Sequence, residues 1–139
     1  LKNKKKYNFK FGIARIFNTT GKNQKKGNFV PDMVNKIRTS SYINNINQYR
    51  DFIHIDDVTK SIKLLIDNEF EKPINISSGK RINLINVCKI LNKLTLNKKL
   101  SFDKERGENI YGNNTLLKKL GIKKFRNTTQ ILRKYTSHG

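Results

Sequence analysis

The sequence contains few of the residues that form cross-links, bind metals or cross membranes. It has one cysteine, Cys88, which excludes an internal disulfide. No Cys/His cluster has the spacing of a zinc site, so we predict no metal. No run of about 18 apolar residues is present, so we predict no membrane-spanning helix. The first residues, LKNKKKYNFKF, are charged but lack the apolar core of a signal peptide, so we predict a soluble, cytoplasmic chain.

Acidic residues are also scarce, and the chain is therefore strongly basic. Its 30 Lys and Arg residues against 10 Asp and Glu give a formal net charge of +20. Such an excess is typical of proteins that bind nucleic acid or another anionic surface. The lysines, however, are spread over every segment instead of forming one stripe, and this favours a bias of composition over a nucleic-acid footprint. A basic nucleic-acid-binding module remains the alternative.

The apolar residues of this 139-residue chain lie in periodic blocks that predict one domain with alternating strands and helices. We expect strands at 9–17, 51–55, 73–77 and 99–103, a polar loop at 18–28, and a short strand and turn in SYINNINQY. We expect helices that start near Pro31, Asp56 and Asn83, and two more at about 114–120 and 129–136. This alternation predicts an α/β fold.

One nine-residue stretch, RDFIHIDDV (50–58), places two aspartates directly behind an apolar strand. At a helix start, such carboxylates meet unpaired N–H groups and the positive end of the helix dipole, so we expect Asp56 to cap the helix. We expect His54 to be a buried framework residue. Arg50, at the rim of the sheet, has two interpretations: a guanidinium that presents its planar donors to phosphates, or a surface salt bridge.

Five segments occur in an order that resembles a known family. They are RIFNTTG (15–21), NFVP (28–31), RDFIHIDDV (50–58), INISSGKRINL (74–84) and LLKKLGI (116–122). Together they resemble the C-terminal half of the NAD-dependent epimerase/dehydratase family, the extended short-chain dehydrogenases that act on nucleotide sugars. The resemblance covers roughly residues 11–122.

The resemblance implies the C-terminal part of a Rossmann-type fold, including its substrate-binding subdomain. Residues 1–139 would form a partial domain, with the N-terminal dinucleotide-binding half absent. A homodimer of the intact parent is left open. Gly79 would form the turn after a strand near the cleft.

The resemblance also implies a site for a nucleotide-diphosphate sugar. Asn18 would hydrogen-bond the phosphate and sugar region, and Asn28 and Phe29 would contact the sugar and nucleoside. Arg50 and Arg106 would grip the diphosphate from two sides, because planar guanidinium donors suit phosphate oxygens.

In three places the sequence departs from the family pattern. Arg106 is followed by glycine without the usual proline, and the span from Arg106 to Asn113 is about two residues short. Tyr111 is the candidate sugar contact in that span. The usual Gly-x-Gly turn before Arg50 is replaced by residues 44–46, Asn-Asn-Ile, in which only asparagine readily takes a left-handed backbone.

Two features that the family's chemistry requires are missing. The sequence has no glycine-rich dinucleotide turn and no Tyr-x-x-x-Lys pair, so we predict no catalytic or cofactor-binding residue in this chain and no activity of the fragment alone. The resemblance implies that the intact parent binds NAD or NADP and exchanges hydride at C4 of the sugar. It would then be an epimerase or a dehydratase. The alternative is a GDP-4-keto-6-deoxy-sugar reductase of the same superfamily, because FNTTG resembles a loop of that branch.

Overall fold

The computed structural model describes residues 11–136, which alternate between strands and helices. The first elements are β1 (Ala14–Ile16), β2 (Asn18–Thr20), α2 (Phe29–Thr39), β3 (Tyr42–Ile43), β4 (Tyr49–His54) and α3 (Ile55–Asp67). The remainder are β5 (Ile74–Ile76), β6 (Arg81–Asn83), α4 (Leu84–Thr95), β7 (Ser101–Phe102), α5 (Thr115–Lys119) and α6 (Thr128–Thr136). The predicted α/β fold is confirmed.

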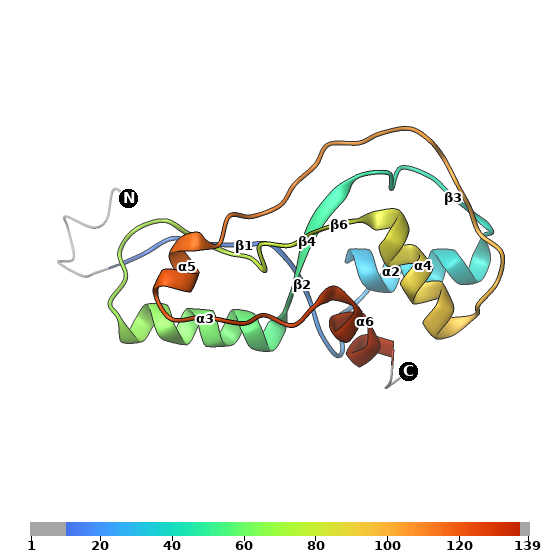
Figure 1. Ribbon diagram of the computed structural model, residues 1–139. Coiled ribbons are helices and arrows are strands. Elements are labelled where there is room, and N and C mark those ends of the chain that lie inside the picture. Colours follow the sequence, from blue (N-terminus) through green and yellow to red (C-terminus); the bar gives the residue numbers. More distant parts are fainter. Residues whose placement is uncertain (1–10, 137–139) are drawn as a thin grey trace.

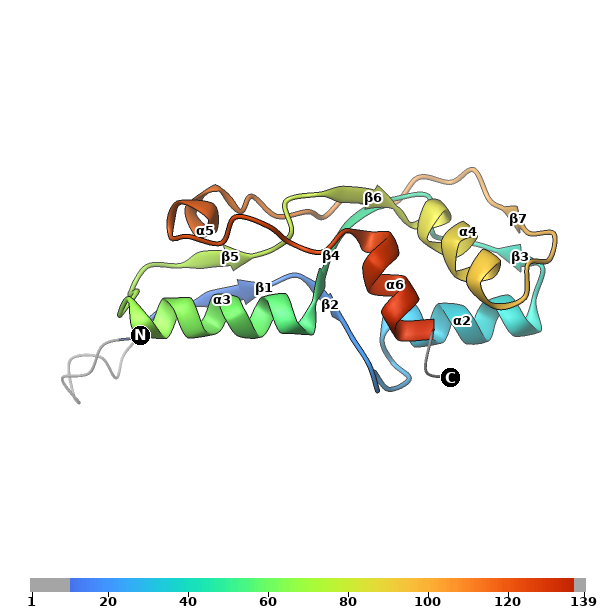
Figure 2. The ribbon, with the colours of Figure 1, turned by 60° about the horizontal axis from the view of Figure 1, so that its bottom comes forward.

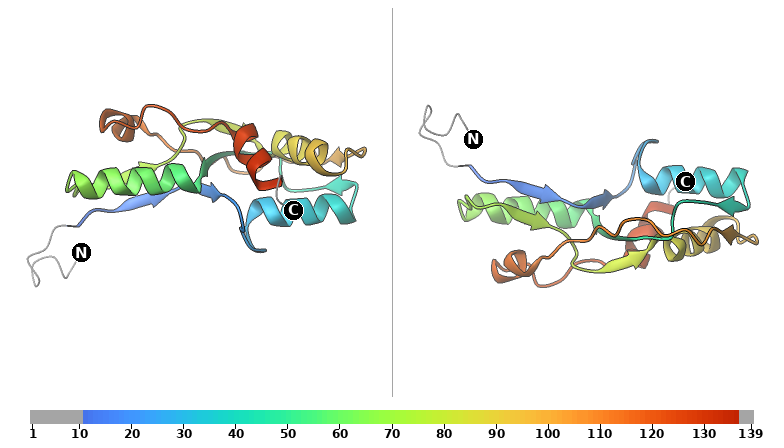
Figure 3. Two further views of the ribbon diagram at one scale, coloured as in Figure 1. Left: turned by 90° about the horizontal axis from the view of Figure 1, so that it is seen from below. Right: turned by 90° about the horizontal axis from the view of Figure 1, so that it is seen from above.

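The strands form three small ladders, and β4 is the central strand of the largest. It pairs with β2 in parallel and with β6 antiparallel. Strands β1 and β5 form a parallel pair, as do β3 and β7. The molecule is elongated, with α3, α5, β1 and β5 at one end and α2, α4, α6, β3 and β7 at the other (Figures 1 and 2). Figure 3 shows the same division from two further sides.

Strand β4 contributes to the core on both of its faces. Phe52 belongs to the larger apolar cluster, in which α2, α4 and α6 pack together. Its neighbour Ile53 belongs to a second cluster with Val58 and Ile76. Successive side chains of a strand point to opposite faces, so a strand buried on both sides carries a continuous apolar run. This is why FIHI predicts the strand correctly.

Helix α2 forms near its predicted start and is amphipathic. Val30, Met33 and Ile37 are buried on one face. The helix begins at Phe29, two residues before the expected start, and Pro31 lies within the first turn, where no intrahelical N–H bond is lost. The expected left-handed asparagine before β4 is Asn45, with φ of 58°.

Three predictions about strands and caps were wrong. Residues 18–20, expected to be loop, form β2, because their backbone groups pair with β4. Residues 81–83, for which no strand was expected, form β6. The N-cap of α3 is His54 and not Asp56: His54 Nδ1 accepts the Asp56 N–H at 3.1 Å, because the strand geometry continues to residue 54 and the helix starts at Ile55. His54 itself is buried, as expected.

The apolar face of α3 is only partly covered. Val58 is buried, whereas Ile62 and Ile66 are 37% and 70% exposed. None of the helices within residues 11–136 combines the length and apolarity needed to cross a bilayer.

Candidate functional site

A segment that we call the strap, residues 103–112, lies along the first half of β4. Arg106 is bridged to Asn47 and Ile110 to Arg50, both in parallel. Backbone hydrogen bonds join Gly107 N to Asn47 O at 3.3 Å and Ile110 N to Tyr49 O at 3.0 Å. In Figure 1 the strap is the orange segment that arches from the α4 end back towards α5. The backbone of Arg106 therefore lies beside Asn47, three residues before Arg50 in the neighbouring segment.

The guanidinium of Arg50 is largely used within the chain. Its Nη1 donates to Tyr49 O at 2.9 Å and to Glu108 O, and its Nη2 donates to Gln48 Oε1 at 3.1 Å. The side chain of Arg50 makes no ion pair within residues 11–136, so the salt-bridge interpretation was wrong. Arg50 instead fastens the strap to β4 and keeps its Nε–H and one Nη2 hydrogen for another acceptor.

Arg106 is exposed, and its side chain makes no hydrogen bond or ion pair with any residue in the described part of the chain. Its position is set by the strap backbone alone. All of its donors are therefore available to a ligand.

Two of the other predicted contacts, Asn18 and Phe29, lie against β4. Asn18 donates from Nδ2 to Asp51 O at 3.1 Å across the β2–β4 pair. Asn28 precedes α2 and donates to Lys25 O at 3.0 Å. The ring of Phe29 packs on that of Phe52, with centroids 5.7 Å apart. Asn18 and Phe29 thus contact β4, whereas Asn28 contacts the loop before α2.

Tyr111 takes part in a cluster that sequence reasoning missed. The Arg81 guanidinium carbon lies over two tyrosine rings, 5.4 Å from the centroid of Tyr49 and 5.6 Å from that of Tyr111. Three segments, β4, β6 and the strap, each supply one residue. The sequence offered no signal for this cluster, because β6 becomes a strand only by pairing with β4.

The turn that leads into β6 is held by a buried carboxylate. Asp51 Oδ1 accepts the Ser78 N–H at 2.9 Å and the Ser78 hydroxyl at 2.6 Å, and Oδ2 accepts the Gly79 N–H at 2.8 Å. Burial raises the pKa of Asp51 above its usual value, against the opposing effect of these hydrogen bonds. Gly79 has φ of 71°, which confirms the predicted turn.

Asp56 and Asp57, the two adjacent aspartates at the start of α3, bind an arginine far along the chain. Asp57 accepts from Arg126 Nη1 at 2.6 Å and from Arg126 N at 3.0 Å. Asp56 lies 3.0 Å from Arg126 Nη2. These bonds tie the segment before α6 to the start of α3. A carboxylate in the first helical turn gave no hint of this partner, which is 69 residues further along.

The glycine turn at Gly79 is already occupied by groups of the chain itself. Asn114 fills the Gly79 turn, because its Oδ1 would lie 2.6 Å from a β-carbon at Gly79. The N–H group of Gly79 is already bound to Asp51. The N-terminus of α3 is covered by His54 and by the Arg126 contacts.

Within residues 11–136 no group of His, Cys, Asp or Glu could hold a metal. Burial raises the pKa of Cys88 to about 12, so its thiol is a poor nucleophile.

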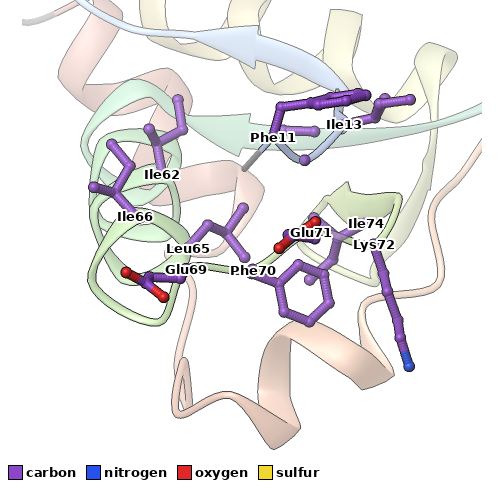
Figure 4. A pocket seen from close by; sticks show the side chains of 12 residues that line it. Phe11, Ile13, Ile62, Leu65, Ile66, Glu69, Phe70, Glu71, Lys72 and Ile74 are labelled. Carbon is purple, nitrogen blue, oxygen red and sulfur yellow. The ribbon is translucent and has the colours of Figure 1, made fainter. Parts of the chain in front are cut away.

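A hollow at the other end of the molecule is apolar and contains none of the predicted site residues. It is lined mainly by β1, α3 and the α3–β5 connection, including Phe11, Ile13, Leu65 and Phe70. Figure 4 shows Ile62 and Ile66 of α3 on one side of it and Phe11 and Ile13 on another. We place the candidate site at β4 and not here, because the hollow lacks convergent hydrogen-bond donors.

The same fold occurs in solved structures of nucleotide-sugar enzymes. A UDP-N-acetylglucosamine 4-epimerase from Methanobrevibacter ruminantium M1, in complex with UDP-N-acetylmuramic acid, is 20% identical with a TM-score of 0.78. A UDP-glucose 4-epimerase from Thermus thermophilus, in complex with NAD, is 14% identical with a TM-score of 0.81. A UDP-glucose 4-epimerase from Thermotoga maritima, with UDP-glucose, is 20% identical with a TM-score of 0.79.

The profile of the NAD dependent epimerase/dehydratase family matches residues 2–83, more than half of the chain. This chain belongs to that family, as its ordered motifs predicted. The three structures are matched over 98%, 99% and 97% of this chain but over only 48%, 49% and 47% of their own lengths. The chain thus spans about half the length of these structures. Among curated proteins, none matches the sequence.

Proposed function

We propose that this chain is the nucleotide-sugar-binding part of an NAD(P)-dependent epimerase or dehydratase. The observation that carries the proposal is the pair of bridges that hold the strap, which carries Arg106, beside the segment that carries Arg50. Each guanidinium offers a planar pair of donors to phosphate oxygens, and a diphosphate has enough oxygens for both. Asn18, Phe29 and Tyr111 flank the same strand and are the proposed sugar and nucleoside contacts.

The redox step is assigned to a dinucleotide-binding half outside this sequence. Support comes from the share of the solved structures that the chain covers, which is about half of their length. The exposed apolar face of β1 and α3, including Ile13, Ile16 and Ile66, is where we propose that this half packs. In this division the present residues bind and orient the sugar nucleotide, and residues 1–139 catalyse nothing alone. We further propose a cytoplasmic location, in keeping with the absence of disulfides.

A nucleoside diphosphate sugar is the proposed substrate class, because two related structures hold UDP sugars. The test is a calorimetric titration of the intact parent with UDP-, dTDP- and GDP-sugars, repeated with Arg106→Ala. Because the Arg106 side chain has no partner in the described part of the chain, its removal should leave the stability of the protein unchanged. Affinity for the sugar nucleotide should fall by roughly 10- to 100-fold, because a hydrogen bond to a charged group is lost. Arg133→Ala on α6, which removes the same charge from an exposed position, is the matched control.

Arg50→Ala should weaken affinity as well, but it also frees the strap, so it is the less specific variant. Unchanged affinity in both variants for a sugar nucleotide that binds the parent would refute the assignment. The outcome also separates the reactions: turnover of a UDP sugar with retention of its hydroxyls indicates an epimerase, loss of water a dehydratase, and reduction of a GDP-4-keto sugar the reductase branch.

The net charge of +20 supports a second candidate, a nucleic-acid-binding module. Binding through phosphates releases counterions, so affinity for DNA or RNA would fall steeply with salt. A flat response to salt, or no binding at about 100 mM salt, would remove this candidate.

A further inference from the structure

Arg81 differs from the other structured arginines in how its charge is held. Arg126 is bound to two carboxylates and Arg50 to chain oxygens. Arg81 lies against the rings of Tyr49 and Tyr111, and its guanidinium makes no hydrogen bond or ion pair within residues 11–136. An aromatic ring stabilises a cation through its face but accepts none of its N–H groups in the plane. The N–H edge of Arg81 is thus left without an acceptor.

The carboxylate nearest to Arg81 in the ladder does not neutralise it. Asp51 is the direct antiparallel partner of Arg81. Its two oxygens are turned to Ser78 and Gly79, and the residue is fully buried. Lys80, the preceding residue, is exposed and adds a second positive charge. Lys80 and Arg81 therefore place two positive charges next to each other in the chain.

The two tyrosines add further donors. Within the described residues neither phenol hydroxyl has a hydrogen-bond partner, and both side chains are partly exposed, Tyr49 at 37% and Tyr111 at 51%. A guanidinium and two hydroxyl groups from three chain segments can all donate to one group of oxygens. Because both rings already order the guanidinium, little of its freedom is lost on binding.

We propose that Arg81, Tyr49 and Tyr111 form a binding site for an oxyanion of the phosphate type. In the β4–β6 ladder, Arg81 shares a face with Asp51, whereas Arg50 pairs with Ile82 on the other face. The site therefore shares Tyr111 with the proposed sugar-nucleotide site but not Arg50, and it stands if the diphosphate contact of Arg50 fails. The anion is either free phosphate or the phosphate of a larger ligand such as a nucleotide sugar.

The experiment is an NMR titration of the chain with sodium phosphate at constant ionic strength. We expect the Arg81 Nε–H resonance and the ring resonances of Tyr49 and Tyr111 to shift together and to saturate. Arg81→Gln should weaken the binding that the ring resonances report by at least about tenfold. Arg133→Gln removes the same charge from α6 and should leave the binding unchanged. Arg81→Lys, which keeps the charge without the planar donor pair, should lie between wild type and Arg81→Gln.

A second pair of variants keeps the test decisive if Arg81→Gln alters the backbone amide spectrum. Tyr49→Phe and Tyr111→Phe retain the rings but lose the hydroxyls, and each should weaken phosphate binding by a few-fold. A parallel titration with UDP-glucose identifies where the bound anion comes from. If UDP-glucose shifts the Arg81 resonance at lower concentration than phosphate, the anion belongs to the nucleotide. If only phosphate shifts this resonance, the anion is free phosphate. Shifts that do not saturate, or that are equal in Arg81→Gln and wild type, would overturn the proposal.

Discussion

At the scale of single residues, the turn between β5 and β6 shows how one buried group sets the position of its neighbours. Asp51 binds the Ser78 and Gly79 amides, and Asn114 fills the space over Gly79 and donates to Ser77 O at 3.1 Å. The turn directs the chain into β6, which carries Arg81. Its geometry is therefore a condition for the cluster with the two tyrosines.

Gly79→Ala should destabilise the chain by about 2–3 kcal/mol. Roughly 1 kcal/mol comes from the left-handed backbone, and the rest from displacing the Asn114 amide, which would lie 2.6 Å from the new β-carbon. Gly27→Ala is the matched control, since Gly27 has φ of 90° but no atom within 4 Å of the β-carbon that alanine would add. Denaturant unfolding should show the smaller loss for Gly27→Ala, and equal losses would contradict the packing argument.

The buried Asp51 predicts a pH dependence of stability with a definite sign. Its pKa in the folded state is raised above 3.8 by burial, so the native state binds a proton that the unfolded state has already lost. The free energy of unfolding contributed by Asp51 therefore falls as pH rises from about 3.8 through the raised pKa. Asp51→Asn removes this titration.

The check is denaturant unfolding of wild type and Asp51→Asn over this pH range. The stability of wild type relative to the variant should be greatest at low pH and should shrink as pH increases. A difference that grows with pH would mean that hydrogen bonding outweighs burial at Asp51.

At the scale of elements, the start of α3 and the segment before α6 are joined by charge. Asp57 is 8% exposed and Asp56 is 49% exposed, and both contact Arg126. Breaking a largely buried pair leaves a desolvated charge, whereas an exposed pair contributes little. The two adjacent aspartates therefore contribute unequally to the stability of the chain, and Asp57 contributes more.

Asp57→Asn should destabilise the chain by about 2–3 kcal/mol, and Asp56→Asn by less than about 1 kcal/mol. The measurement is denaturant unfolding, with a double-mutant cycle that uses Arg126→Gln to isolate the coupling. Equal losses for the two aspartates, or no coupling between Asp57 and Arg126, would contradict the assignment.

The elements also show what the sequence could predict. The pattern of apolar residues predicts helix α2 and strand β4, because the side chains that these elements bury are their own apolar residues. Strands β2 and β6 have three residues each and are largely polar, so their extended state depends on pairing with β4. The sequence indicates that Arg50 lies at the edge of an apolar strand. Its contact with Glu108, the partner of Asp57 and the Arg81 cluster depend on residues distant in sequence.

At the scale of the whole molecule, the two ends differ in character. Exposed apolar side chains, including Ile13, Ile62 and Ile66, lie around the hollow at the β1–α3 end, whereas the arginines of the proposed sites lie along β4. An apolar area of this kind marks an interface more often than a free surface. This asymmetry supports a division into a packing end and a ligand-binding region.

The chain alone should bind the dye ANS at the β1–α3 end. Ile62→Asn combined with Ile66→Asn should reduce the fluorescence enhancement several-fold, because ANS reports exposed apolar surface. Ile110→Asn, at a similarly exposed isoleucine of the strap, is the matched control and should leave the signal unchanged. A reduction of equal size in both variants would refute the location of the apolar interface.

The central claim is that Arg106 and Arg50 contact the diphosphate of a sugar nucleotide, and ³¹P NMR of the ligand tests it most directly. When UDP-glucose, or the sugar nucleotide that calorimetry selects, is titrated with the intact parent, we predict that both phosphorus resonances shift. Arg106→Ala should remove most of that shift, and Arg133→Ala should leave it intact. Phosphorus shifts that are the same in wild type and in Arg106→Ala would contradict the account.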